Sequence, residues 1–294
     1  MQIRSILTVL DKPKHKQTAF EAAQQLQEQT GANLDLVAFR FNSLYDHDGA
    51  LDKEQRRQLR HKVVADSRAW MKELAADSTV PEKTKMRTIW TSDIADWLAD
   101  EVIERPVDLV VKSIHGSKTF TYTPTDWQIL RTCNVPVLLK STQRRRKPGN
   151  VVLVGLDFTR ADAKRRKLNQ KAMDAAKCMA ALTGAKVHGV FALEISEVLR
   201  DLDIIDKKVT RKSILGRVMP DVEQFLAAND LPKSRMHFPV GKAGRVINSL
   251  AHDLNADLLV LGTGIHRVRQ AIGLGSTAER VLPRAYRDVL VVHP

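Results

Sequence analysis

The sequence lacks the features that mark secreted or membrane-spanning chains. Its 294 residues include only 2 cysteines, Cys133 and Cys178, which form neither a disulfide framework nor a metal-binding motif. No apolar run approaches the ~18 residues that a membrane-spanning helix needs. The apolar stretch within residues 1–12 is short and soon becomes charged, unlike a signal peptide. We therefore expect a cytoplasmic protein.

Motifs of common enzyme classes are also missing. The sequence contains no GxxxxGK[ST] phosphate loop, no GxSxG nucleophile elbow and no HExxH metal-binding helix. Its 9 histidines are dispersed, without metal-ligand spacing, and no residue stands out as a general base. The sequence thus predicts no metal site and no catalytic residue, and it favours a binding protein over an enzyme.

Charge is abundant and mainly positive, with a net value of +13 at pH 7. The lysines and arginines are scattered among 34 acidic residues, and only residues 143–149 (QRRRKPG) form a dense basic run. We interpret the excess as a solvated basic surface. Nucleic-acid binding is the less favoured alternative, and it predicts an affinity that falls steeply with salt.

An internal repeat is the main feature that is present. Residues 3–14 and 150–161 are both apolar runs, rich in β-branched residues, that close on an aspartate, Asp11 and Asp157. A helical pattern follows each run. Self-similarity on this scale indicates two copies of one structural unit.

The correspondence continues to the end of the chain. Both helical patterns end in Thr-Gly-Ala, where Gly31 and Gly184 fit the position just beyond a helix C-terminus. Further on, residues 107–113 (VDLVVKS) match residues 256–262 (ADLLVLG). The repeat therefore spans nearly the whole chain.

Each copy alternates short apolar strands with helices, a pattern that predicts a parallel sheet covered on both faces. We therefore expect two tandem, doubly wound α/β domains, each with a five-stranded, mostly parallel sheet. The polar segment 141–150, which contains proline and glycine, is the natural linker. This places the domains at residues 1–142 and 148–294.

Residues 261–281 (LGTGIHRVRQAIGLGSTAERV) combine a strand end with a glycine-rich loop. Gly262 ends the strand predicted at 257–261, and Gly275 and Ser276 come thirteen residues later, where a helix begins. Glycine lets backbone N–H groups approach an oxyanion, and the helix N-terminus and the hydroxyls of Ser276 and Thr277 can add to such a site. An ordinary strand–loop–helix unit needs the same residues, so they leave phosphate binding and a plain loop open.

The strand-terminal aspartates, the repeat layout and a glycine followed thirteen residues later by Gly-Ser resemble the universal stress protein family. The double copy resembles its tandem, two-domain members. The resemblance covers almost the entire chain and implies a stress-response binding or signalling module. It also implies an adenine nucleotide as ligand, ATP with or without Mg²⁺, with ATP hydrolysis weak at most.

The resemblance further implies that strand ends and one loop of the second copy hold the nucleotide. Asp157 would contact the ribose or the adenine edge, and Val190 would hold adenine through its backbone. The implied contact residues are Gly155, Asp157, Val190, Leu261, Gly262, Thr263, Gly264, Gly275, Ser276 and Thr277. The alternatives are a helix cap for Asp157 and plain core packing for Val190.

The sequence departs from the pattern of the ATP-binding members, Gly-x2-Gly-x9-Gly-Ser/Thr, at one place. Ile265 stands at the second glycine, and Gly264 lies one residue earlier. A Cβ atom at 265 would crowd the phosphates unless the loop shifts its register. Whether Ile265 abolishes ATP binding stays open.

The first copy has lost the loop pattern. Ser113, Thr123 and Pro124 stand in place of the two glycines and the serine, and proline removes a backbone donor. We therefore assign nucleotide binding to the second copy. The first copy is either structural or a carrier of an apolar, lipid-like ligand.

The resemblance also bears on assembly. In dimers of this family the last strands pair across the two-fold axis, so residues 136–140 and 289–293 are expected to pair within one chain. The result would be an intramolecular pseudo-dimer, monomeric or associated as a homodimer, with an unidentified protein partner.

Overall fold

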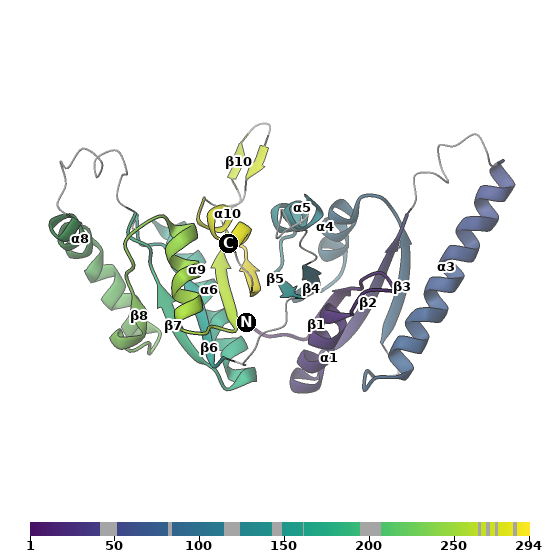
Figure 1. The fold of residues 1–294 in the computed structure, drawn as a ribbon, viewed down its shortest axis with the longest axis horizontal. Coiled ribbons are helices and arrows are strands. Elements are labelled where there is room, and N and C mark those ends of the chain that lie inside the picture. The colour runs from purple at the N-terminus through teal and green to yellow at the C-terminus, as the bar shows by residue number, and fades with distance from the viewer. Residues whose placement is uncertain are drawn as a thin grey trace. The chain divides into compact units, whose positions relative to one another are not determined.

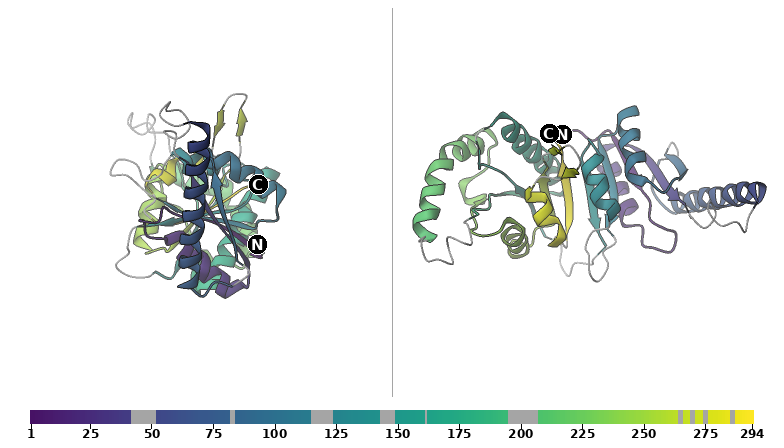
Figure 2. Two further views of the ribbon diagram at one scale, coloured as in Figure 1. Left: turned by 90° about the vertical axis from the view of Figure 1, so that its right-hand side faces the viewer. Right: turned by 90° about the horizontal axis from the view of Figure 1, so that it is seen from above.

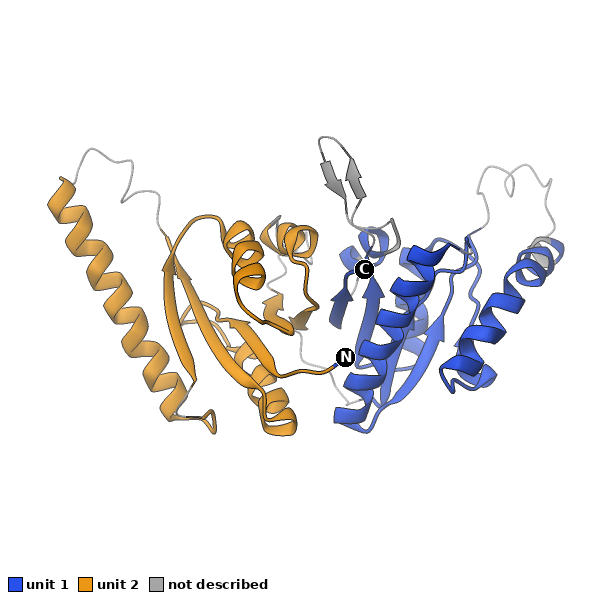
Figure 3. Ribbon diagram, turned by 180° about the vertical axis from the view of Figure 1, so that it is seen from behind, with its two compact units in different colours: residues 1, 116–122, 143–294 blue, residues 2–115, 123–142 orange. Residues whose placement is uncertain are grey.

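The computed structural model describes residues 1–41, 52–81, 84–114, 124–142, 149–160, 162–194, 207–263, 266–268, 271–273, 276–284 and 287–294. These residues form two compact units (Figure 3), one within residues 2–142 and one within residues 149–294. Because residues 143–148 lie outside the described ranges, the domain limits at 142 and 148 stay a prediction. So does the pairing of 136–140 with 289–293.

The N-terminal unit alternates strands and helices along the chain (Figure 1). Its elements are β1 (Ser5–Val9), α1 (Thr18–Thr30), β2 (Asn33–Arg40), α3 (Lys53–Ala76), β3 (Lys85–Trp90), α4 (Ile94–Glu104), β4 (Leu109–Ile114), α5 (Pro124–Thr132) and β5 (Val137–Ser141).

The five strands of this unit lie in the order β3-β2-β1-β4-β5, and every neighbouring pair is parallel. The chain moves outward from β1 to β3 and then returns through β4 to β5. Right-handed crossovers therefore place α1 and α3 on one face of the sheet and α4 and α5 on the other. This is the predicted doubly wound arrangement.

The C-terminal unit repeats this plan. Its elements are β6 (Val151–Gly155), α6 (Ala163–Thr183), β7 (Lys186–Val190), α8 (Lys207–Ala228), the 3-10 helix η1 (Lys233–Arg235), β8 (Met236–His237), α9 (Ala243–Asp253), β9 (Leu258–Gly262), β10 (His266–Val268), β11 (Ala271–Gly273), α10 (Ser276–Val281), the 3-10 helix η2 (Leu282–Arg284) and β12 (Asp288–Val292).

Parallel pairing gives the C-terminal unit the order β8-β7-β6-β9-β12. Helices cover both faces of the sheet (Figure 2). The short strands β10 and β11 pair antiparallel with each other. The strand order reverses between β6 and β9, so the crevice at the carboxyl ends of these strands is where such a fold binds ligands.

The sheets form the cores of both units. The central strands β1, β4, β6 and β9 consist mainly of buried Ile, Leu and Val, as expected for parallel strands covered on both faces; buried Lys112 and Ser113 of β4 are polar exceptions. Gly31 and Gly184 adopt φ of 69° directly after α1 and α6, which confirms the predicted helix ends. Within the described ranges, no helix combines the length and apolar character needed to cross a bilayer.

Candidate functional site

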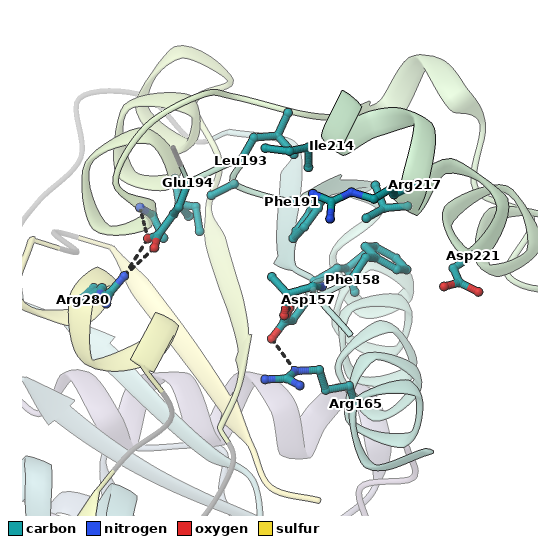
Figure 4. Close-up of a pocket in the computed structure, with 16 residues that line it drawn as sticks. Asp157, Phe158, Arg165, Phe191, Leu193, Glu194, Ile214, Arg217, Asp221 and Arg280 are labelled. Carbon is teal, nitrogen blue, oxygen red and sulfur yellow. Dashed lines mark hydrogen bonds and ion pairs between the residues drawn. The ribbon is translucent and has the colours of Figure 1, made fainter. Parts of the chain in front are cut away.

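A cleft of about 480 Å³ opens at the carboxyl ends of β6 and β7 (Figure 4). Residues that directly follow these strands form its floor, and α8 contributes one wall. The first turns of α9 and a side chain from α10 close the far side. The lining residues are Leu156, Asp157, Phe158, Thr159, Arg165, Phe191, Ala192, Leu193, Glu194, Ile214, Arg217, Val218, Asp221, Ala243, Ile247 and Arg280.

Asp157 lies at the floor of this cleft with 39% of its side chain exposed. Its Oδ1 accepts hydrogen bonds from the amide of Thr159 at 2.9 Å and from the hydroxyl of Thr159 at 2.6 Å. Its Oδ2 lies 2.8 Å from Nε of Arg165. The carboxylate is therefore fixed, and its Oδ2 keeps a lone pair beyond these bonds.

Asp157 is not a helix cap. Helix α6 begins at Ala163, and its N-cap is Asp162, which accepts a hydrogen bond from the amide of Arg165 at 2.8 Å. That bond also lowers the pKa of the Asp162 carboxyl. The capping alternative for Asp157 was wrong because the loop after β6 is long enough to supply another aspartate at the helix start.

Arg165 reaches Asp157 because α6 extends further toward the strand end than its counterpart. Helix α6 has 21 residues and α1 has 13, a difference of eight residues or about two turns. Burial opposes the charge of Arg165, but its bonds to Asp157 and Asp162 outweigh that effect and raise the pKa of its guanidinium.

A second ion pair lies across the cleft. Both carboxylate oxygens of Glu194 bind Nη1 of Arg280, at 2.8 and 2.6 Å, and Oε1 accepts the amide of Ala243 at the start of α9. Burial alone would raise the pKa of Glu194, but these donors lower it. Gly244 permits this geometry, since a Cβ there would lie 2.0 Å from the Arg280 carbonyl oxygen.

The backbone at the end of β7 presents polar groups to the cleft. The amides of Phe191 and Leu193 bond the carbonyls of His237 and Pro239 on the side of β8. Because backbone groups alternate direction along an extended chain, the N–H and C=O of Ala192 face the other way. Among the described residues they make no hydrogen bond, and Ala192 lines the cleft.

Val190 is fully buried in β7, and its carbonyl accepts the amide of Leu156 at 2.9 Å. This placement agrees with the core-packing alternative. The adenine contact of Val190 stays a prediction, and Ala192, two residues further on, is better placed for it.

The other predicted strand-end residues lie beside this cleft. Leu261 and Thr263 are buried, and the Thr263 amide bonds the Val292 carbonyl at 2.9 Å. Gly155 and Gly262 end β6 and β9. A Cβ at 262 would lie 2.7 Å from Cγ of Leu168, so this glycine has a packing reason as well as any ligand role.

The remaining predicted residues fall largely outside the described part of the chain. Gly264, Ile265 and Gly275 lie outside the described residues. Ser276 and Thr277 form the first turn of α10, as predicted from the glycine-rich stretch. Their roles at a phosphate stay predictions.

Comparison with known proteins shows where this architecture belongs. The family model named "Universal stress protein family" matches residues 2–139 and 150–293, which together are nearly the whole chain. The chain belongs to the universal stress protein family. Two family segments in one chain confirm the tandem organisation.

Relatives share this length. Universal stress protein E of Escherichia coli K12 is 26% identical over 300 residues, which cover 99% of this chain and 94% of that protein. The Haemophilus influenzae homolog is 25% identical over 305 residues, covering 100% and 98%. A putative universal stress protein from Pseudomonas aeruginosa UCBPP-PA14 has the same fold, with a TM-score of 0.72 at 24% identity, covering 99% and 94%.

Sequence reasoning found Asp157 but missed most of the lining of this universal stress protein's cleft. Ala192 and Glu194 follow β7 within a few residues, so strand-end position could have indicated them. The contributions of Arg165, Arg217 and Arg280 depend on how α6, α8 and α10 pack. A helical arginine in a basic sequence carries no signal of its own.

Proposed function

We propose that the C-terminal unit binds an adenine nucleotide and that the chain is a non-catalytic stress-response module of the cytoplasm. The cleft at the ends of β6 and β7 carries this proposal. Its volume of about 480 Å³ falls in the usual range for small-molecule sites. It lies beside the reversal of strand order, where doubly wound sheets bind nucleotides.

The backbone N–H and C=O of Ala192, which make no hydrogen bond among the described residues, support adenine as the base. A neighbouring N–H and C=O on one extended strand can donate to N1 of adenine and accept from its 6-amino group. Hypoxanthine and guanine present the opposite pattern, N1–H and O6, and would leave both backbone groups unpaired. Asp157 would then meet a ribose hydroxyl with the lone pair that Oδ2 retains.

The polar groups of the cleft support binding rather than catalysis. The two carboxylates nearest its floor and rim, Asp157 and Glu194, are each held by an arginine at 2.6–2.8 Å. For Glu194 the amide of Ala243 and the Arg280 guanidinium lower the pKa of the carboxyl, which makes it a poor general base. We infer that occupancy alters the adjoining loops and so the choice of protein partner.

Calorimetric titration of the nucleotide-stripped protein tests this function. With Mg²⁺ present, ATP is expected to bind with micromolar affinity, and ITP at least tenfold more weakly, about 1.4 kcal/mol, because of the reversed base edge. Gly275→Val is expected to abolish ATP binding if the loop holds the phosphates. Absence of binding heat with ATP, ADP and adenosine alike would refute the proposal.

A further inference from the structure

Helix α8 turns an unusual face toward the cleft. Ile214, Arg217, Val218 and Asp221 line it, and Phe225 lines the small adjoining cavity. These positions recur three or four residues apart, so they form one stripe along the helix. An inward stripe is normally apolar, but this one carries an arginine and an aspartate at its centre.

The stripe is held firmly against the floor of the cleft. Phe225 makes an edge-to-face contact with Phe158 at a centroid distance of 5.6 Å, and Phe158 makes the same contact with Phe191. On the same helix Val222 and Leu226 are buried. Packing therefore fixes this part of α8, and Arg217, which is exposed, lies on the same helix at the cleft.

Arg217 differs from the other two cleft arginines. Arg165 and Arg280 are each bound to carboxylates, whereas Arg217 makes no hydrogen bond or ion pair among the described residues. Asp221, one turn further along α8, forms no ion pair with Arg217. Figure 4 shows the Arg217 side chain reaching toward Phe191, with Asp221 lying apart.

The strand order decides which part of a nucleotide would meet Arg217. Strands lie in the order β9-β6-β7. Under the proposed function, the phosphates lie at the loop after β9, the ribose at Asp157 after β6, and the base at Ala192 after β7. The base end of the cleft is therefore the end that α8 covers, where Phe191, Ile214 and Val218 supply apolar walls.

We propose that Arg217 stacks its guanidinium plane on the face of the bound adenine and so makes α8 a base-selecting wall of the site. This inference rests on the proposed function. A guanidinium is flat and weakly hydrated, and bases stack on it favourably. The ligand class is thus a nucleotide whose base is held by its edge at Ala192 and by its face at Arg217.

Two substitutions separate stacking on the base from a contact with phosphate. In Arg217→Met the flat cation is lost, and the affinities for adenosine and for ATP are expected to fall by the same factor, about tenfold. In Arg217→Lys the charge remains without the plane, so a loss of similar size is expected. Arg211→Met, on the same helix but outside the cleft lining, is the matched control and should bind as the unaltered protein does.

Calorimetry with adenosine and with ATP, at low and at moderate salt, provides the measurement. Equal losses for both ligands that vary little with salt support the inference. A loss confined to ATP and restored by Arg217→Lys would overturn it in favour of a phosphate contact, and unchanged affinities would overturn it outright. If the unaltered protein binds neither ligand, the proposed function itself fails, which is a distinguishable result.

Discussion

The aspartates that end the first strand of each unit have opposite surroundings. Asp11 is buried, and its Oδ2 accepts the hydroxyl of Ser113 at 2.6 Å. Asp157 is partly exposed and faces the cleft. The residue equivalent to Ser113 is Gly262, which has no side chain to offer. The aspartate carboxylate after the first strand is therefore buried against Ser113 in the N-terminal unit, whereas in the C-terminal unit it remains partly exposed to the cleft.

The start of the last α-helix in each unit, α5 and α10, also differs between the two units. In the N-terminal unit, Nζ of Lys112 lies 2.6 Å from Oδ1 of Asp126, and the pair is almost completely buried. The equivalent residues of the C-terminal unit are Leu261 and Ala278, which are also buried. A buried ion pair in the N-terminal unit thus stands where the C-terminal unit has two buried apolar residues.

A binding crevice can therefore be closed without a change of fold. Strand order and helix placement are the same in both units. What differs is whether the polar group at the strand end is buried with its partner, as Asp11 is, or remains partly exposed to the crevice, as Asp157 is. Buried polar groups require hydrogen-bond partners. A unit that satisfies its strand-end groups with its own side chains has fewer hydrogen-bonding groups left to bind a polar ligand.

The largest effect is expected from breaking the buried ion pair. Lys112→Leu leaves the Asp126 carboxylate buried without its ammonium partner, which should lower the free energy of unfolding of the N-terminal unit by about 3–5 kcal/mol. All 4 tryptophans lie within residues 1–142. Urea unfolding followed by tryptophan fluorescence therefore reports on this unit.

The double variant Lys112→Leu/Asp126→Ala places in the N-terminal unit the two residues that the C-terminal unit has at the equivalent positions, and so tests the two arrangements in one context. Replacing both charges by apolar groups is expected to recover most of the loss. If the double variant were as unstable as the single one, the apolar pair of the C-terminal unit could not replace the buried ion pair of the N-terminal unit.

An intermediate effect is expected for a buried histidine of the C-terminal unit. Burial, with a smaller contribution from Lys171, lowers the pKa of His293 from 6.5 to about 4. The unfolded chain therefore takes up a proton between these pH values while the folded chain does not. Stability should fall by about 3 kcal/mol as the pH drops from 6.5 to 4, and not further below.

The matched variant is His293→Ser, since Ser141, the last residue of β5, occupies the equivalent sequence position. It removes the titrating group, so its free energy of unfolding should depend less on pH over this range than that of the unaltered protein. Hydrogen exchange of peptides from β12 at several pH values provides the measurement. Parallel pH profiles for the two proteins would show that His293 does not titrate as its burial requires.

The smallest effect is expected from the two strand-end aspartates, and its kind should differ between them. Asp11→Ala removes the charged acceptor of the buried Ser113 hydroxyl and should cost about 1.5–3 kcal/mol of stability without altering ATP binding. Asp157→Ala removes a partly exposed ion pair and should cost less than about 1 kcal/mol, yet weaken ATP binding. Urea unfolding paired with calorimetry checks both. A reversal of the two patterns would refute the assignment of the site to the C-terminal unit.

Much of the fold was predictable from local sequence. The third strand of the C-terminal unit is the weakest case: the sequence of residues 236–240 (MHFPV) favours a strand, but regular pairing is confined to Met236–His237, with an isolated bridge at Val240. Proline at 239 removes a ladder donor there. By contrast, the apolar residues of 244–254 recur at helical spacing, and they form α9, Ala243–Asp253.

The tryptophans show the limit of composition as a guide. Tryptophan is a large ring that suits a core or a ligand cavity, yet Trp70, Trp90, Trp97 and Trp127 are all half-buried. Arginine guanidinium groups lie over each of them, at 5.1–6.0 Å from the ring centroid. An amphipathic ring can cover the rim of a core as well as fill it, and the sequence alone does not distinguish the two.

The amino-acid sequence by itself determined the duplication, the doubly wound fold, the helix ends at Gly31 and Gly184, and the placing of Asp157 at a strand end. These follow from periodicity and local backbone preferences, which act over a few residues. Three contacts became known only from the tertiary structure. Arg165 forms an ion pair with Asp157, and Ser113 donates a hydrogen bond to Asp11. Arg217 lines the cleft. Such contacts join segments distant in sequence, so they depend on helix length and packing, which no local pattern encodes.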